Sequence, residues 1–294
     1  MSWRIVVIAK RSKLDLQLGY LVVRGEAVQK IHLSEISLLM IENTAVSLTA
    51  ALLAELVRLK IKVVFCDEKR NPSAELLPYY GAHDTSAKIR QQVAWKKETK
   101  GAVWAEIVRN KIRNQADLLA FAEKEESVLL YQYLTEIEAD DRTNREGHAA
   151  KVYFNALLGK GFSRADSCAI NAALNYGYTI LLSACNREIV SNGYITQLGI
   201  HHCNVDNMFN LGSDLMEPFR AFVDARVFAL WMNGDLEIFG HKQKMEVVSV
   251  LNAEIQVNEK IYNLDYALKI FVKSVLDAMH EDEMSGIAVC GFLK

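Results

Sequence analysis

The sequence predicts an α+β protein in which a β-rich domain, residues 1–81, precedes a larger all-α helical domain, residues 82–294. The pattern of apolar residues changes from strand-like to helix-like after Gly81. The long second part also contains a single proline, Pro218. Because proline costs about 3 kcal/mol inside a helix, its scarcity favours helical structure there. A chain of 294 residues is long enough for two such domains.

Strand signals dominate the first domain. Short runs of Val, Ile and Leu over residues 3–48 are typical of half-buried strands. Residues 48–60 have apolar side chains at helical spacing, and a further apolar strand follows over 61–67. Asn71-Pro72 indicates a turn and Pro78 a break. We therefore expect a small sheet domain that carries one helix.

Helical signals dominate the second domain. Apolar residues recur three and four positions apart, which is typical of helices that bury one face. The segments with this spacing are 87–95, 104–122, 149–158 and 263–280. Residues 161–184 indicate a further helix, rich in small and polar residues such as Asn171 and Tyr178, that packs closely against its neighbours.

Composition limits the class of protein. No apolar run is long enough to cross a bilayer, and the first residues lack a secretory apolar core, so we expect a cytosolic protein. The five cysteines include no C-x-x-C pair. An odd number without such pairs argues against a disulfide framework and against a structural zinc site, and predicts free, mostly buried thiols.

Positive charge gathers in one window although the formal net charge is −2. Residues 88–113 hold eight basic residues against two acidic ones. Such a stripe can follow the phosphate backbone of DNA, but exposed helix faces are also commonly rich in lysine. The basic residues are Lys88, Arg90, Lys96, Lys97, Lys100, Arg109, Lys111 and Arg113.

Two stretches carry candidate metal ligands. Glu146 precedes a predicted helix, where it is either a metal ligand or general base, or a carboxylate favoured by the helix dipole. In the second stretch, His201 and His202 are adjacent and point to opposite sides if the segment is extended, so one of them is structural. Asp214 and Glu217 lie three residues apart on one helix face.

The two acids have a second interpretation. Asp214 could be the N-cap of a helix with Glu217 reaching back to it, and Pro218 fits a helix start. If instead a glutamate, a histidine and a second glutamate converge, they form a site for Mg²⁺ or Mn²⁺ that suits phosphoryl transfer. Arg220 could then hold Glu217 in place or contact a phosphate.

Three motifs, in this order, resemble those of the CRISPR-associated integrase, the first Cas protein of spacer acquisition. They are E-G-x-A-A-x-x-Y-F from residue 146, N-A-A-L-N-Y-G-Y-T-I-L from residue 171, and G-I-H-H from residue 199 followed by N-L-x-x-D-L-M-E-P-F-R-x-x-V-D from residue 210. The resemblance covers nearly the whole chain, and the start and G-I-H-H are most similar to the type II-A branch, which accompanies a Cas9-type effector.

This resemblance implies a β-sandwich-like N-terminal dimerisation domain and a helical catalytic domain. It implies that Glu146, His202 and Glu217 are the metal-binding and catalytic residues, with Asp214 beside them. It also implies a homodimer that joins a small second Cas adaptation protein into a heterohexamer in the bacterial cytoplasm. Further type II-A adaptation proteins and the Cas9-type effector are additional expected partners.

The implied reaction is the insertion of a short protospacer duplex into the CRISPR array. Each 3′-OH attacks a phosphodiester at a repeat edge, and the same site can cut branched DNA. Lys88, Arg90, Lys96 and Lys97 are then candidate contacts to DNA phosphates. Two alternatives stay open: a repair nuclease for branched DNA, and a non-catalytic DNA-binding assembly scaffold whose acids only cap helices.

Overall fold

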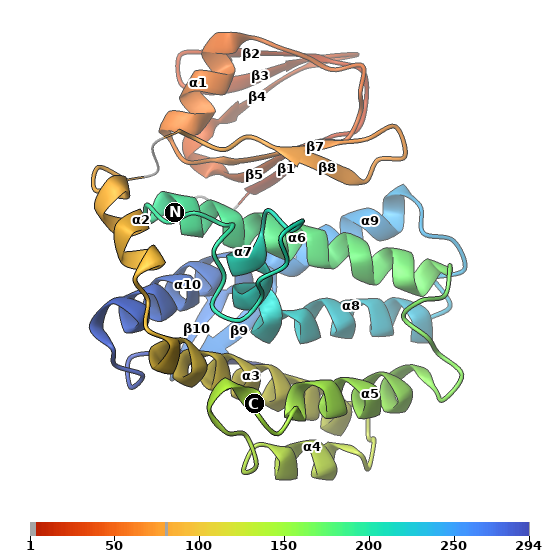
Figure 1. Cartoon of the computed structure of the whole chain (residues 1–294). Coiled ribbons are helices and arrows are strands. Elements are labelled where there is room, and N and C mark those ends of the chain that lie inside the picture. Colours follow the sequence, from red (N-terminus) through yellow and green to blue (C-terminus); the bar gives the residue numbers. More distant parts are fainter. Residues whose placement is uncertain (1–3, 80–81, 294) are drawn as a thin grey trace. The chain divides into compact units, whose positions relative to one another are not determined.

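The computed structural model describes residues 4–79 and 82–293 of the chain (Figure 1). The chain divides into two compact units, Met1–Gly81 and Ala82–Lys294. Trp3, where the first predicted strand begins, lies outside the described residues. The α+β class expected from the sequence is confirmed, because the first unit is built mainly of strands and the second mainly of helices.

The first unit contains two four-stranded sheets, ordered β4-β3-β2-β6 and β1-β5-β7-β8. Their strands are β1 (Arg4–Ile8), β2 (Lys13–Gln17), β3 (Tyr20–Arg24), β4 (Val28–His32), β5 (Ile36–Ile41), β6 (Ser47–Leu48), β7 (Lys62–Cys66) and β8 (Pro72–Glu75). In the second sheet β1, β5 and β7 are parallel, and β8 is an antiparallel edge strand.

One apolar core joins both sheets and the single helix, α1 (Ala50–Arg58). Leu14 and Leu21 come from one sheet, Leu39 and Val63 from the other, and Leu52 from the helix, and all five side chains are fully buried. Two sheets that share one core in this way form the expected sandwich-like arrangement.

Two local expectations for this unit need correction. Pro72, predicted to lie in a turn, begins strand β8, which pairs with β7 across an irregular register. A proline is tolerated there because the first residue of an edge strand does not need its N–H for the ladder. Helix α1 begins at Ala50 rather than Leu48, because Thr49 caps it by accepting a hydrogen bond from the N–H of Leu52 at 3.3 Å.

The second unit is organised around one long helix, α3 (Lys97–Phe121), which buries residues on nearly every side. It packs against α4, α5, α8 and α10, and against the short 3₁₀ turns η2 and η3. The remaining helices and turns are α2 (Thr85–Val93), α4 (Ser127–Tyr133), η2 (Ala139–Asp141), α5 (Arg145–Leu158), α6 (Ala169–Ser191), α7 (Asn210–Met216), η3 (Glu217–Phe219), α8 (Arg220–Met232), α9 (His241–Val248), η4 (Ser249–Asn252) and α10 (Leu264–Glu281).

A small sheet accompanies these helices, which the sequence interpretation as a purely helical domain missed. Strand β9 (Glu254–Val257) pairs with β10 (Lys260–Asn263) in a hairpin and, on its other edge, with β11 (Cys290–Gly291). Figure 1 shows β9 and β10 beside the helices of this unit.

The predicted free thiols are confirmed, with Cys66, Cys185 and Cys290 buried and Cys168 and Cys203 exposed. No helix within residues 4–79 and 82–293 combines the length and the apolar character that a membrane span requires.

Candidate functional site

Glu146 is held in the first turn of α5 by an unusual loop. The backbone N–H groups of Glu146 and of the residue before it donate to the carboxylate of Asp141, each at 2.9 Å. Asp141 thereby satisfies two donors that a helix start otherwise leaves without partners. Asp140, Asp141 and Asn144 have φ values of 61°, 45° and 52°, in the left-handed region that non-glycine residues rarely adopt. Strained backbone of this kind is often found at functional sites.

His202 is oriented by Asp214, whose carboxylate is fully buried. The Nδ1 atom of His202 lies 2.6 Å from Asp214 Oδ1, and the backbone N–H groups of Ile200, His201 and His202 donate to the same carboxylate at 2.6, 3.1 and 3.0 Å. Because a carboxylate accepts hydrogen bonds, Nδ1 carries the proton and Nε2 is left as the atom that can bind a metal ion.

The close approach of this loop to Asp214 requires Gly199. A Cβ atom at that position would lie 2.3 Å from the carbonyl oxygen of His202 and 2.8 Å from Asp214 Oδ2. The hydrogen bond that His202 donates to Asp214 raises the pKa of His202 against the opposing effect of burial, and the negative charges of Asp214, Glu217 and Glu146 raise it further. His202 therefore lies within the field of both glutamates.

His201 points elsewhere. Its ring stacks on Trp104 with centroids 4.3 Å apart and an interplanar angle of 4°, and its Nδ1 lies 3.5 Å from Asp140 Oδ1. The planes of the two histidine rings are at 90° to each other. The expectation that one of the two adjacent histidines is structural fits this arrangement.

Glu217 is more buried than Glu146 and His202, with a side chain only 4% exposed. Burial raises the pKa of its carboxyl, but the positive charges of Lys111 and Arg220 outweigh burial and lower that pKa to about 2. Arg220 Nη1 donates to Glu217 Oε1 at 2.9 Å, and Lys111 Nζ lies 2.5 Å from Oε2. The carboxylate is thus held in its ionised form from two sides.

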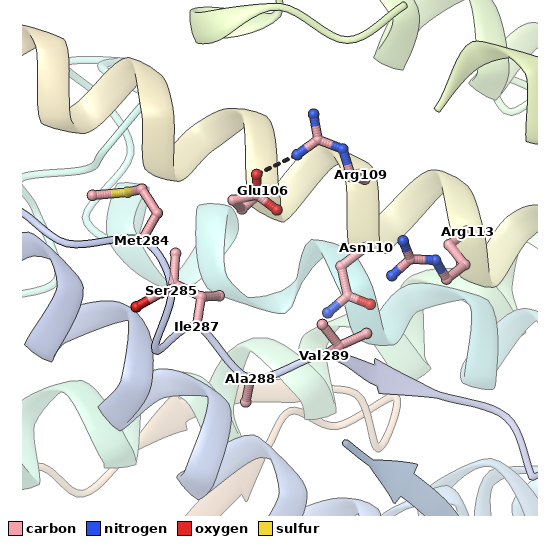
Figure 2. A pocket seen from close by; sticks show the side chains of 9 residues that line it. All are labelled: Glu106, Arg109, Asn110, Arg113, Met284, Ser285, Ile287, Ala288 and Val289. Carbon is pink, nitrogen blue, oxygen red and sulfur yellow. Dashed lines mark hydrogen bonds and ion pairs between the residues drawn. The ribbon is translucent and has the colours of Figure 1, made fainter. Parts of the chain in front are cut away.

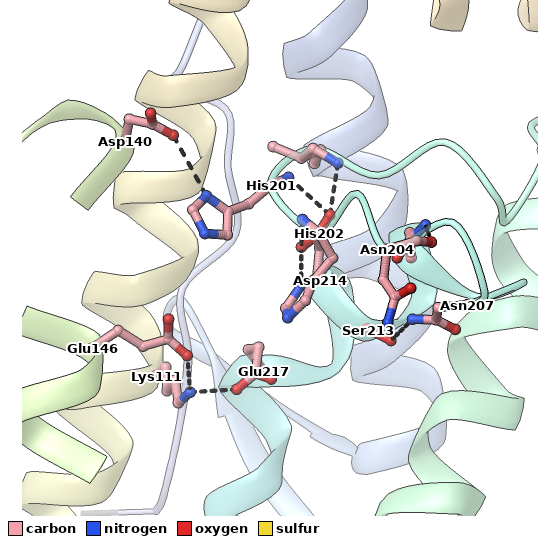
Figure 3. A network of polar contacts seen from close by, with 12 residues as sticks. Lys111, Asp140, Glu146, His201, His202, Asn204, Asn207, Ser213, Asp214 and Glu217 are labelled. Atoms are coloured by element: carbon pink, nitrogen blue, oxygen red, sulfur yellow. Dashed lines mark hydrogen bonds and ion pairs between the residues drawn. The ribbon is translucent and has the colours of Figure 1, made fainter. Parts of the chain in front are cut away.

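The ammonium group of Lys111 joins the two glutamates. Its Nζ atom is 2.6 Å from Glu146 Oε1 as well as 2.5 Å from Glu217 Oε2 (Figure 3). As their side chains stand, no group of three or more His, Cys, Asp or Glu within the described ranges could hold a metal ion. Oxygen atoms from α5 and η3 nevertheless converge on one cationic atom, with His202 on the adjoining loop, so this donor set fits a hard divalent cation.

A buried layer of three polar residues, Tyr153, Tyr178 and Asp224, packs behind Arg220. Its guanidinium lies 4.2 Å from the centroid of the Tyr178 ring. The hydroxyl groups of Tyr178 and Tyr153 both donate to the carboxylate of Asp224, the latter at 2.8 Å. Burial raises the pKa of Asp224 to about 6, although the Tyr178 hydroxyl and the charge of Arg220 act in the opposite direction. This layer links helices α5, α6 and α8 behind Glu217.

The sequence profile of the family described as CRISPR associated protein Cas1 matches residues 5–256. A protein named CRISPR-associated endonuclease Cas1, from Neisseria meningitidis serogroup C (strain 8013), is 32% identical over 278 residues, which cover 93% of this chain and 91% of that protein. The chain belongs to the Cas1 family. The family resemblance derived from the three motifs is therefore confirmed.

Solved structures share the Cas1 fold with this chain. A structure described as a casposase bound to integration product has a TM-score of 0.76 and 19% identity, and the match covers 97% of this chain and 92% of that one. A chain of a Cas6-RT-Cas1–Cas2 complex has a TM-score of 0.73 and 20% identity, covering 99% of this chain and 36% of that one. At such identities the likeness shows the fold alone.

Figure 3 shows where the residues expected from the Cas1 resemblance lie. Glu146, His202 and Glu217 come from α5, from the loop before α7 and from η3. They face one region of the second unit, with Asp214 against His202. Glu146 lies in the first turn of α5, where the helix dipole favours a carboxylate, and this position is compatible with both interpretations considered for it.

The alternative in which Asp214 only caps a helix is wrong. Asp214 lies inside α7 (Asn210–Met216), and its carboxylate accepts hydrogen bonds from the histidine loop. Glu217 begins η3, as the neighbouring Pro218 indicates, but its carboxylate faces Lys111 and Arg220. Of the two roles considered for Arg220, the contact that holds Glu217 is the one observed.

The basic window of residues 88–113 is not one uniform stripe. Lys111 is buried in the site, and Lys96 forms an ion pair with Asp282. Lys88 lies over the ring of Tyr194, with Nζ 5.5 Å from its centroid. Arg90 and Lys97 are exposed. The window therefore offers fewer exposed charges to DNA than its composition indicates.

Part of this window lines a separate cavity of about 330 Å³ (Figure 2). Arg109, Asn110 and Arg113 of α3 face the segment Met284–Val289 across it, and Arg109 forms an ion pair with Glu106. Neither the glutamates nor the histidines of the candidate site line this cavity.

Sequence reasoning missed three residues that shape the site. Lys111 was counted as one of many basic residues, although it lies on the face of α3 that also carries the buried Trp104 and Val108. A lysine within an apolar stripe is a signal that could have identified it. Asp141 gave no usable signal, because its capping contact depends on left-handed residues. Asp224 carries no signal in the sequence beyond its place at the end of the third motif.

Proposed function

We propose that this chain is a metal-dependent DNA integrase and endonuclease of CRISPR adaptation. The observation that carries the proposal is the convergence of Glu146 and Glu217 on one cationic group beside the oriented His202, in a member of the Cas1 family. The endonuclease name of the Neisseria relative and the integration product of the casposase support the same class of reaction.

In this proposal Glu146, His202 and Glu217 bind Mg²⁺ or Mn²⁺. When bound, such an ion polarises a phosphodiester and favours ionisation of an attacking hydroxyl group. The protein orients the ligands: Asp214 fixes the ring of His202, Arg220 fixes Glu217, and Asp141 fixes the helix start that carries Glu146. These supports reduce the reorganisation that the site would need during reaction.

The proposed substrate is a short protospacer duplex with free 3′-OH ends. Each 3′-OH attacks a phosphodiester at the edge of a CRISPR repeat, so that one P–O bond forms as another breaks. Because one phosphodiester replaces another, the step needs no ATP. Sequence preference at the repeat would come from few base contacts together with bending of the DNA.

The proposed assembly is a homodimer formed through the first unit, residues 1–81, with the second unit, residues 82–294, carrying catalysis. The structural neighbour described as a Cas6-RT-Cas1–Cas2 complex supports a Cas2-type protein as partner. A heterohexamer with this small second Cas protein is part of the proposal. Lys88, Arg90, Lys96 and Lys97 are proposed contacts to duplex DNA. The type II-A branch, a Cas9-type effector and a cytoplasmic location belong to the same proposal.

An integration assay tests this function. Purified protein and its Cas2-type partner are mixed with Mn²⁺ or Mg²⁺, a labelled duplex with 3′-OH ends, and a plasmid that carries the CRISPR repeat. We expect the label to become joined to the plasmid, and the joining to be lost in Glu146→Ala, His202→Ala and Glu217→Ala. Lys260→Ala, which changes an exposed residue of β10, is the control that should retain joining.

Other outcomes favour other functions. Cleavage of branched DNA without any joining would favour a repair nuclease. Joining that survives all three substitutions would contradict the metal site and favour an assembly role for this chain. Loss of joining in His201→Ala but not in His202→Ala would assign the metal ligand to His201 instead of His202. The proposed reaction would be unaffected.

A further inference from the structure

The position of Lys111 raises a question that the proposed ligand set does not answer. Its side chain is only 7% exposed, although lysine is almost never fully buried unless it is paired. The two carboxylates of Glu146 and Glu217 provide that pairing from two different elements. The ammonium nitrogen occupies the point on which both ligand oxygens converge, where a bound cation would be expected.

We infer that Lys111 is a built-in substitute for the metal ion, which holds the two glutamates in place in the metal-free protein and competes with the divalent cation for them. This inference rests on the proposed function, since it assumes that Glu146 and Glu217 are ligands. It concerns the affinity of the site for a divalent metal ion.

Charge balance supports the inference that the Lys111 ammonium takes the place of the metal ion. Without metal, the two glutamates are balanced by Lys111 and Arg220, which approaches the opposite oxygen of Glu217. A divalent ion bound between the same oxygen atoms would adjoin the ammonium group, and two cations at such separation repel strongly in a poorly solvated site. Metal and ammonium therefore exclude each other from this position.

The side-chain type also fits exchange. Lysine has a compact charge on a flexible four-carbon stem, so the ammonium can leave the carboxylates by rotation about side-chain bonds. Arginine at this position would instead present a planar fork suited to both carboxylates and would be harder to displace. The affinity for the metal ion should therefore depend on residue 111. It should be highest with a neutral side chain, lower with lysine and lowest with arginine.

Titration of the intact protein with Mn²⁺, followed by the electron paramagnetic resonance signal of the free ion, tests this order. Lys111→Met keeps the length of the side chain and removes its charge, and we expect it to bind Mn²⁺ at least about tenfold more tightly than wild type. Lys111→Arg should bind more weakly than wild type. Without metal, Lys111→Met should unfold at a lower temperature, and Mn²⁺ should raise its unfolding temperature more than that of wild type.

Lys62→Met is the matched control, because Lys62 forms another buried ion pair, with Glu75 in the first unit. It should lower stability without changing Mn²⁺ affinity. If Lys111→Met also leaves Mn²⁺ affinity unchanged, or weakens it, the inference is overturned while the ligand assignment stands. If Lys111→Met fails to fold, an unchanged affinity in Lys111→Arg overturns it equally.

The proposed function fails in a different way. If wild type binds Mn²⁺ and Glu217→Gln binds it equally well, the ligand assignment itself is wrong, and the inference about Lys111 is lost with it. An affinity that falls in Glu217→Gln but does not respond to substitutions of Lys111 overturns the inference alone.

Discussion

The carboxylate of Asp214 determines the orientation of the His202 ring. It receives three backbone N–H groups from the loop and the Nδ1 proton of the ring, so both oxygen atoms are fully used. An amide cannot accept all of these donors, because its nitrogen is itself a donor. The position of the histidine ring therefore depends on the negative charge at residue 214.

Asp214→Asn should lower strand joining by about 10- to 100-fold, the usual effect of losing a group that orients a metal ligand. It should also weaken Mn²⁺ binding, because the ring of His202 is no longer held. Joining activity and Mn²⁺ affinity of the purified variant are the two measurements. Asp206→Asn, which changes an exposed acid in the same loop, serves as control. Unchanged Mn²⁺ affinity in Asp214→Asn would show that Asp214 does not orient a ligand.

For single residues, the sequence indicated which side chains belong to the candidate site but not all of the contacts that they make. The motifs pointed to Glu146, His202 and Glu217, which the fold brings to one region, and their role as metal ligands stays a prediction. The pairing of Lys111 with residues 35 and 106 positions further along the chain could not be predicted, because such contacts depend on how α3, α5 and η3 pack. The family resemblance pointed to His202 rather than His201, but the contacts that distinguish them, with Asp214 and with Trp104, could not be read from adjacent positions.

Helices α6 and α8, which carry Tyr178, Arg220 and Asp224, pack closely against each other. Gly177 of α6 allows this packing, since a Cβ atom there would lie 2.3 Å from Val223 Cγ1 and 3.1 Å from Val223 Cγ2. Because both methyl groups of the valine are affected, rotation of this stiff, β-branched side chain cannot relieve the overlap. The helix that begins at Arg220 would have to move instead.

Gly177→Ala should therefore lower the free energy of unfolding by about 1–2 kcal/mol. This is the usual cost of overpacking a core, of about 1–3 kcal/mol, reduced by the better helix propensity of alanine. Urea unfolding of the purified variant measures it. Gly161→Ala is the control, because no atom lies within 4 Å of the added Cβ. Equal stabilities of Gly177→Ala and wild type would contradict the packing described for α6 and α8.

The long helices could be predicted from periodicity, whereas the small sheet could not. Strands β9 and β10 are joined by a two-residue turn, Asn258-Glu259, in which Asn258 has a φ of 53°. The glycine that usually marks such a turn is missing. Strand β11 lies about thirty residues further along the chain and is only two residues long, so no local pattern indicated it.

Charge is distributed unevenly over the molecule, and this bears on DNA binding. The formal net charge of −2 conceals the basic window, of which Arg90, Lys96 and Lys97 are exposed. Lys96 is already paired with Asp282 and would have to exchange that partner for a phosphate. The composition of the window was readable from the sequence, but the partners of its charges were not, because they come from distant segments.

Arg90→Glu and Lys97→Glu should each weaken duplex binding and make it less sensitive to salt. Loss of one phosphate contact reduces the slope of log affinity against log salt by about one unit. Fluorescence anisotropy of a labelled duplex at several salt concentrations measures this slope. Lys260→Glu, an equal charge change outside the window, should leave it unaltered. Slopes that match wild type in both window variants would remove these residues from the DNA contact.

The most direct test of the central claim is the position of a bound metal ion. Crystals of the intact protein soaked in Mn²⁺ would be measured at a wavelength at which manganese scatters anomalously. We expect an anomalous peak within bonding distance of Glu146, Glu217 and His202 Nε2, with Lys111 Nζ moved away from the two carboxylates. A peak bound by other residues, or no peak at this site while Lys111 still joins the two glutamates, would contradict the assignment of these residues as the metal site.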